Sequence, residues 1–289
     1  MGALTLPILG LVLVAAVVHA AWNLLAKGAQ GGAGFVWLYT VAASVLYLPV
    51  LVAALAMAPG PLGWEAFVFM AGSGALHTVY AVLLQRGYRT GDLSLVYPLA
   101  RGTGPLIATV AAIALFGERP GAVALAGAGL IVLAVLALAR PSPGMAPDTH
   151  RRAAGLAVLT GVAIAAYTLW DKHAVDALAL SPLVYNWGTN AANAVLLTFL
   201  VRNRRGSVRL AWRTSKARAA GVALLSPFAY ILILYALARA PVSAVAPARE
   251  LSILIGTMLG ATVLAEGDGA RRAVASAAIV AGVVALALG

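Results

Sequence analysis

Long apolar runs separated by short polar connections fill almost the whole sequence. Ten of these runs are long enough to cross a bilayer of about 30 Å as α-helices of about 20 residues each. Their approximate bounds are 4–26, 35–57, 64–86, 93–116, 120–139, 153–174, 181–201, 218–239, 242–265 and 271–288. The pattern predicts an all-α polytopic membrane protein with ten transmembrane helices.

Two polar interruptions are longer than the rest, residues 140–152 and residues 202–217, and neither is long enough to form a domain. We expect the first, which is rich in Pro and Gly, to link five helices in residues 1–139 to five more in residues 153–289. The second carries six basic residues, with Arg218 directly after it, and we expect it to be a charged loop.

The two halves are similar at a constant offset of 148 residues. Trp22 matches Trp170, Arg101 matches Arg249, and Glu118 matches Glu266. The shared spacing indicates an internal repeat. Because five is an odd number, the second copy enters the membrane from the opposite side. Such inverted repeats are typical of secondary transporters, whose substrate site lies near the membrane midplane between the repeats.

The composition agrees with this class and excludes others. Of the 289 residues, 62% are hydrophobic and 10% charged, against about 25% charged in soluble domains. The chain has no Cys, which excludes disulfides, and its first segment lacks the charged flank of a signal peptide. The basic residues behind the net charge of +11 lie mostly between the apolar runs, as in membrane proteins. We therefore expect a lipid bilayer as the partner and no nucleic acid.

The distribution of basic residues predicts an orientation. Fifteen of the 20 Lys and Arg residues fall on one side of the ten predicted helices and three on the other. The positive-inside rule places the basic side in the cytoplasm, and both termini outside. We expect a multi-pass protein of a bacterial-type cytoplasmic membrane.

The stretch VYPLARGTGP holds the first candidate site residue, Arg101. It lies about nine residues into its segment, or roughly 13 Å along the helix axis, which is near the midplane. A charge at that depth costs at least about 2.5–3.5 kcal/mol, so it normally faces a cavity or a partner. Arg249 and Glu250 occupy the matching place in the second half. Arg101 and Glu250 either form an ion pair that only locks two helices together or contact substrate.

Prolines surround these charges. Pro98 and Pro105 flank Arg101, and Pro247 precedes Arg249. Proline removes a backbone donor and bends or breaks a helix, and matching interruptions in two repeats indicate a transporter site. We predict hinges at these three prolines, although packing kinks are the alternative.

Polar and aromatic residues at helical spacing complete the candidate site. His19, Trp22 and Asn23 share one segment, and Tyr167, Trp170 and Asp171 occupy another. His77 and Tyr80 lie three residues apart on a third, and Tyr97 precedes Arg101. The tryptophans could equally anchor the membrane interface, and His77 could be a hydrogen bond between helices. His19, His77, Glu250 and Asp171 are all candidates for carrying a proton.

No motif for catalysis, nucleotide binding or a metal site occurs, so we predict neither an enzyme nor a cofactor. The two five-helix repeats, HAAWN, GDLSLVYPLARG and the GE and AE pairs resemble the EamA-like family of the drug/metabolite transporter superfamily. The resemblance implies alternating access around a cavity lined by segments 4–26, 64–86, 93–116, 153–174, 218–239 and 242–265. Members of this branch usually have the N-terminus inside, whereas the charges here predict the opposite.

The predicted function is secondary active transport of a small polar metabolite, driven by protons or by exchange. Two midplane arginines against one acid favour an amino acid or a small organic anion. The alternative is efflux of cationic drugs or amines centred on Glu250 or Asp171 with aromatic walls. A monomer of ten helices is sufficient to enclose the cavity, and GxxxG-like spacings leave a dimer open.

Overall fold

The protein is helical throughout the part of the chain that its computed structural model describes, residues 6–57, 62–116, 121–138, 146–239, 252–253, 255 and 269–288. The helices are α1 (Leu6–Lys27), α2 (Ala33–Leu46), α3 (Leu48–Met57), α4 (Trp64–Thr90), α5 (Leu93–Phe116), α6 (Ala122–Leu138), α7 (Pro147–Asp176), α8 (Pro182–Val201), α9 (Arg205–Leu237) and α12 (Gly269–Leu288). The predicted all-α class is confirmed.

Among the described residues, five helical stretches are long and apolar enough to cross a membrane: α1, the α2–α3 pair, α4, α7 and α9. Nine of the ten predicted segments contain helix in the described residues. The tenth, 242–265, lies outside them except for residues 252, 253 and 255. The chain is therefore a multi-pass membrane protein, while the number of ten spans stays a prediction.

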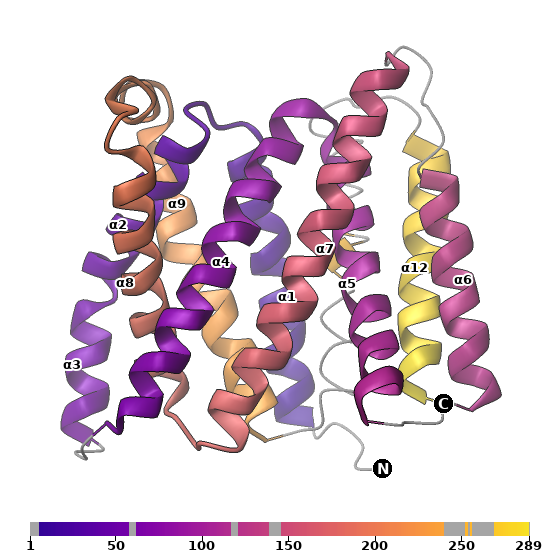
Figure 1. The fold of residues 1–289 in the computed structure, drawn as a ribbon, viewed down its shortest axis with the longest axis horizontal. Helices are drawn as coiled ribbons and strands as arrows, with labels where there is room; N and C mark the ends of the chain where they lie inside the picture. Colours follow the sequence, from indigo (N-terminus) through magenta and orange to yellow (C-terminus); the bar gives the residue numbers. More distant parts are fainter. Residues whose placement is uncertain are drawn as a thin grey trace.

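The helices run side by side with their axes in roughly one direction, and α6 and α12 lie together at one edge (Figure 1). In the body of the bundle, α4 packs against α7 and α8, and α9 packs against α1 and α2. Helix α5 packs against α7. The start of α1 and the end of α12 lie at the same end of the bundle, as an even number of spans requires.

Several helix boundaries differ from the predicted ones, and two of the differences involve prolines. Segment 35–57 is divided at Tyr47 into α2 and α3, because Pro49 follows and cannot donate a backbone hydrogen bond to the preceding turn. Helix α7 begins at Pro147 instead of residue 153, with the proline in its first turn, where its missing N–H is tolerated.

The prediction of a loop over residues 202–217 is wrong. Helix α9 begins at Arg205 and continues to Leu237, with a kink at Ser215, where φ is −136° and ψ is 15°. Its first three turns lie across the end of the bundle, seen end-on at the top left of Figure 1. The charges suggested a loop, but Val208 and Trp212 lie four residues apart and form an apolar stripe on an amphipathic helix.

Ion pairs and hydrogen bonds tie the helices together at this same end. Arg272, only 1% exposed at the start of α12, donates to Asp92 Oδ2 at 2.7 Å and to Ser94 Oγ at 2.5 Å. Lys27, at the end of α1, donates to the carbonyl oxygens of Tyr88 at 2.6 Å and Gly91 at 2.5 Å. The α4–α5 connection is thus fastened to α1 and to α12.

Helices α5 and α7 approach closely at Gly161, so a larger side chain there should lower the stability of the protein. A Cβ atom at Gly161 would overlap the Thr103 hydroxyl and lie 2.9 Å from the Ala100 carbonyl oxygen. We expect Gly161→Ala to lower the free energy of unfolding by about 1–3 kcal/mol, as overpacking does. The measurement is the unfolding midpoint of the purified protein in detergent.

Gly155→Ala is the matched control, because it lies on the same helix and a Cβ there has no atom within 4 Å. Alanine is the better helix former, so this variant should be neutral or stabilised by about 0.5–1 kcal/mol. A Gly161→Ala protein as stable as Gly155→Ala would contradict the close approach of α5 and α7.

Candidate functional site

A polar cavity of about 60 Å³ lies among α1, α2, α4, α7, α8 and α9. Its lining combines two histidines, five aromatic side chains and a group of amides and hydroxyls: His19, His77, Trp22, Tyr39, Tyr80, Tyr167, Tyr230, Asn186, Thr189, Asn190, Asn193 and Ser226. Drug-sized ligands occupy sites of about 300–1,000 Å³, so the cavity in this conformation suits a small molecule.

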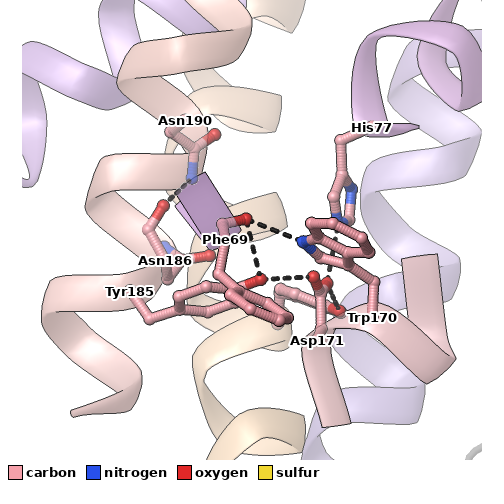
Figure 2. A network of polar contacts seen from close by, with 8 residues as sticks. Phe69, His77, Trp170, Asp171, Tyr185, Asn186 and Asn190 are labelled. Carbon is pink, nitrogen blue, oxygen red and sulfur yellow. Dashed lines mark hydrogen bonds and ion pairs between the residues drawn. The ribbon is translucent and has the colours of Figure 1, made fainter. Parts of the chain in front are cut away.

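An ion pair between His77 of α4 and Asp171 of α7 forms one wall of the cavity. His77 Nε2 lies 3.1 Å from Asp171 Oδ2, and Figure 2 shows the two side chains facing each other. His77 is 16% exposed and lines the cavity, whereas Asp171 is fully buried behind it. The pair therefore connects the cavity to a buried carboxylate.

Two tyrosines hold the Asp171 carboxylate in place. The Tyr185 hydroxyl of α8 donates to Oδ1 at 2.6 Å, and the Tyr230 hydroxyl of α9 donates to Oδ2 at 2.5 Å. With His77, both carboxylate oxygens have donors from three different helices. A buried carboxylate needs such hydrogen bonds to offset its lost hydration. Asp171 thus joins α4, α7, α8 and α9.

Aromatic rings surround His77. Its ring stacks on Tyr167 with centroids 4.2 Å apart, and Tyr230 and Tyr80 meet it edge-on at 5.1 and 6.2 Å. Tyr167 also contacts Tyr80 and Tyr230. The imidazole can therefore turn little, and the π faces of these rings can attract a cation in the cavity.

Amides and hydroxyls of α8 form the opposite wall. Asn186 and Asn190 lie one turn apart, and the Asn190 side chain donates to the Asn186 backbone oxygen at 2.9 Å (Figure 2). Asn193, a further turn along the same side, accepts from the Thr78 hydroxyl at 2.8 Å. Neutral amides both donate and accept, so this wall can bind a carboxylate or an ammonium group.

The sixth helix of the lining, α9, contains a proline at the cavity. Pro227 lies inside the helix and lines the cavity next to Ser226. Proline has no N–H to bond the carbonyl four residues earlier, so α9 lacks one helical hydrogen bond beside the site. The sequence prediction considered other prolines and did not single out Pro227.

Five of the predicted site residues line the cavity: His19, Trp22, His77, Tyr80 and Tyr167. On α1, the Trp22 indole N–H donates to His19 Nδ1 at 3.3 Å, so the two side chains of HAAWN orient each other. Asp171 lies behind His77 and contacts two residues of the lining, His77 and Tyr230.

Asn23 and Trp170 connect helices away from the cavity. Asn23 is fully buried and accepts from the Tyr88 hydroxyl at 2.5 Å, which joins α1 to α4. Trp170 donates to the Phe69 carbonyl oxygen at 2.9 Å and packs on the Phe69 ring at 4.6 Å. Trp22 and Trp170, which occupy matching positions of the predicted repeat, therefore have different environments.

Arg101 is buried in α5 with 1% exposure, and neither it nor Tyr97 is among the described residues that line the cavity. Helix α5 passes both Pro98 and Pro105 without ending, so neither proline breaks it. The remaining candidates, Pro247, Arg249 and Glu250, lie outside the described residues, and so does the predicted pair between Arg101 and Glu250.

The lining differs from the one implied by the family resemblance. Tyr39 of α2 and four residues of α8 contribute, whereas no described residue of α5 does. Asn186, Asn190 and Asn193 follow a spacing of three and four residues, which is the signal for one polar helix face. Tyr39 and Tyr230 sit in apolar runs that carry no such signal. No described cluster of His and acidic residues could hold a metal ion.

A helical bundle with a polar cavity inside it is the architecture expected of a membrane transporter. Residues 151–288 match the model of the EamA-like transporter family. Over these residues the predicted resemblance to the EamA-like family of the drug/metabolite transporter superfamily is confirmed. Members of the family are transporters and not enzymes.

Comparison with solved structures supports the fold of the whole chain, with 21 matching chains. One, named only "Crystal structure of protein", has a TM-score of 0.66 and 19% identity, and the match covers 96% of this chain and 94% of that one. At this identity the likeness concerns the fold alone. No curated protein matches the chain.

Proposed function

We propose that this protein is a proton-coupled secondary transporter that moves a small polar metabolite, with an amino acid as the favoured substrate, by alternating access. The observation that carries the proposal is the cavity in which His77 is exposed on one side and paired with the fully buried Asp171 on the other. A titratable pair at a substrate cavity inside a membrane is the arrangement expected of a proton relay.

The two walls of the cavity favour a zwitterion. Tyr80, Tyr167 and Tyr230 offer aromatic faces to an ammonium group, and the amides of Asn186 and Asn190 offer donors to a carboxylate. Protonation of His77 would add a positive charge beside the bound anion. Substrate and proton would then stabilise each other in the same cavity, which is the coupling that a symporter or an exchanger needs.

Arg101 stays in the proposal as a second contact for an anionic group. It is buried in α5, which packs against α7, and α7 provides Tyr167 to the cavity. A shift between α5 and α7 during transport would bring the guanidinium towards the substrate. The proposed hinges at Pro98, Pro105 and Pro247 serve the same movement.

Helix packing supports the proposed inverted repeat. The pair α4–α7 has a counterpart in the pair α9–α1. The pair α4–α8 likewise has a counterpart in the pair α9–α2. Exchanging the two halves of the chain reproduces these pairs, since α1, α2 and α4 correspond to α7, α8 and α9. Rocking of two such related units around a fixed site is the usual mechanism of alternating access.

The proposed location is a bacterial-type cytoplasmic membrane with both termini outside. Lys27, Arg218 and Arg272 all belong to the end of the bundle opposite the start of α1. Basic residues gather on the cytoplasmic side of membrane proteins, so this end would face the cytoplasm.

The substrate class is tested by thermal shift of the purified protein with amino acids, organic acids, sugars and amines, because a bound ligand raises the unfolding midpoint. We expect amino acids to stabilise the wild type. Asn190→Leu should weaken their binding about 10- to 100-fold, because a hydrogen bond to a charged group is lost. The hits are then tested for uptake into proteoliposomes under an imposed pH gradient.

A second candidate function, efflux of amines, is favoured by the aromatic rings around His77. Tyr80→Leu in parallel with Asn190→Leu separates the two. Stabilisation by amines alone, lost in Tyr80→Leu and kept in Asn190→Leu, would replace the amino acid with an organic cation. Stabilisation without uptake under any gradient would overturn transport itself.

A further inference from the structure

The first three turns of α9 and the neighbouring ends of α2 and α8 enclose a second, larger groove, with a volume of about 630 Å³. Trp37 and Leu38 of α2 and Val201 of α8 contribute to its apolar lining, together with Val208 and Trp212 of α9. We call this the interfacial groove. It shares no lining residue with the polar cavity, so the proposed transport site does not account for it.

Three arginines, Arg202, Arg205 and Arg209, also line the interfacial groove. Arg205, Val208, Arg209 and Trp212 follow the spacing of one helix face, so charge and apolar surface alternate along a single side of α9. The two polar groups at the floor satisfy each other, since the Trp37 indole donates to the Thr198 hydroxyl at 2.8 Å. The groove therefore joins an apolar floor to guanidinium groups.

The positive charge around the groove is not balanced nearby in the sequence. Seven basic residues lie between Arg202 and Arg218, and no Asp or Glu occurs between Asp176 and Glu250. Within the described part of the chain, no carboxylate pairs with the three groove arginines. Guanidinium groups bind phosphate oxygens as a planar fork, so an anionic ligand complements this charge.

The amphipathic start of α9 is held firmly on the bundle by the α1–α2 connection. A Cβ atom at Gly34 would lie 2.6 Å from the Ser207 backbone, and Gly31 adopts a φ of +99° against Ala211. The Gln30 N–H donates to Ser215 Oγ at 3.0 Å. Because one face is packed this closely, the face with Arg205 and Trp212 has a fixed position in the groove.

We propose that the interfacial groove binds an anionic phospholipid, with its phosphate on Arg202, Arg205 and Arg209 and an acyl chain against Trp37, Val208 and Trp212. The start of α9 lies across the end of the bundle (Figure 1), where headgroups and acyl chains meet. Trp212 is 59% exposed, which suits contact with lipid. Charge and apolar surface together select an anionic lipid over a zwitterionic one.

The test is native mass spectrometry of the full-length protein in detergent, titrated with dioleoyl phosphatidylglycerol or dioleoyl phosphatidylcholine. We expect the wild type to prefer phosphatidylglycerol by about 30-fold or more. Arg205→Gln/Arg209→Gln should lose about 30-fold in affinity for phosphatidylglycerol, with little change for phosphatidylcholine. The matched control is Arg213→Gln/Lys216→Gln, which removes the same charge outside the groove lining and should change affinity less than about threefold.

A second comparison separates lipid from free anion. Trp212→Ala should weaken binding of the dioleoyl lipid and leave the dihexanoyl lipid unchanged, and millimolar inorganic phosphate should not displace either. Equal losses in the groove and control variants would overturn the site in favour of diffuse surface charge. Displacement by phosphate without any effect of Trp212→Ala would indicate an anion site only. The wild type alone also tests the proposal, even if a variant fails to fold. Equal binding of phosphatidylglycerol and phosphatidylcholine by the wild type would contradict it.

Discussion

Asp171→Asn is expected to reduce uptake driven by a pH gradient strongly, while leaving exchange of substrate between the two sides of the membrane. The asparagine keeps the size of the side chain and can still accept hydrogen bonds from Tyr185 or Tyr230 through its one carbonyl oxygen. It removes the charge that faces His77 at 3.1 Å. Protonated His77 would then be an unbalanced cation inside the membrane, a state that is strongly unfavourable.

We expect gradient-driven uptake to fall about 10- to 100-fold, the effect of losing one charge-assisted hydrogen bond. The measurement is uptake by proteoliposomes with and without a pH gradient, followed by counterflow in the absence of a gradient. His77→Gln should show the same separation of the two activities, because glutamine still donates to Asp171 but takes up no proton.

Asp176→Asn is the control, because it makes the same change on the same helix. Asp176 is 55% exposed and pairs only with Lys172 one turn away, an interaction worth little at a surface. If Asp171→Asn still shows gradient-driven uptake at the wild-type rate, the proposed proton site is contradicted. Equal losses in both variants would point to the charge of α7 as a whole.

The second large effect is expected in stability, from Asp92→Ala. This substitution removes the carboxylate that lies 2.7 Å from the guanidinium of Arg272, whose side chain is 1% exposed. A buried charge that loses its partner is strongly destabilising, and Asp92 itself is partly exposed. We expect the free energy of unfolding to fall by roughly 2–3 kcal/mol, measured by equilibrium unfolding in mixed micelles.

The double variant Asp92→Ala/Arg272→Met should recover part of this loss, because it removes the buried charge together with its partner. Asp148→Ala is the matched control. Asp148 is exposed in the first turn of α7, where an acidic residue contributes only about 0.3–1 kcal/mol. A double variant no more stable than Asp92→Ala would show that the ion pair is not the source of the effect.

Several residues of the candidate site could be found from the sequence because polar side chains are rare in apolar helices. His19, Trp22, His77, Tyr80 and Tyr167 were predicted on that basis, and all five line the cavity. Burial of a polar residue in a membrane needs a partner or a polar space, so its presence alone is informative. The same reasoning could not separate Asn23, which fastens α1 to α4, from residues of the cavity.

The sequence by itself determined the all-α membrane class, the family resemblance and most positions of the helices, because apolar length and repeated spacing are properties of the chain. The tertiary structure decided which polar residues meet. His77 and Asp171 are 94 positions apart, and only the packing of α4 on α7 brings them within 3.1 Å. It also turned the basic segment at Arg205 into a helix lying across the bundle, since that helix is stabilised by close contact with the α1–α2 connection.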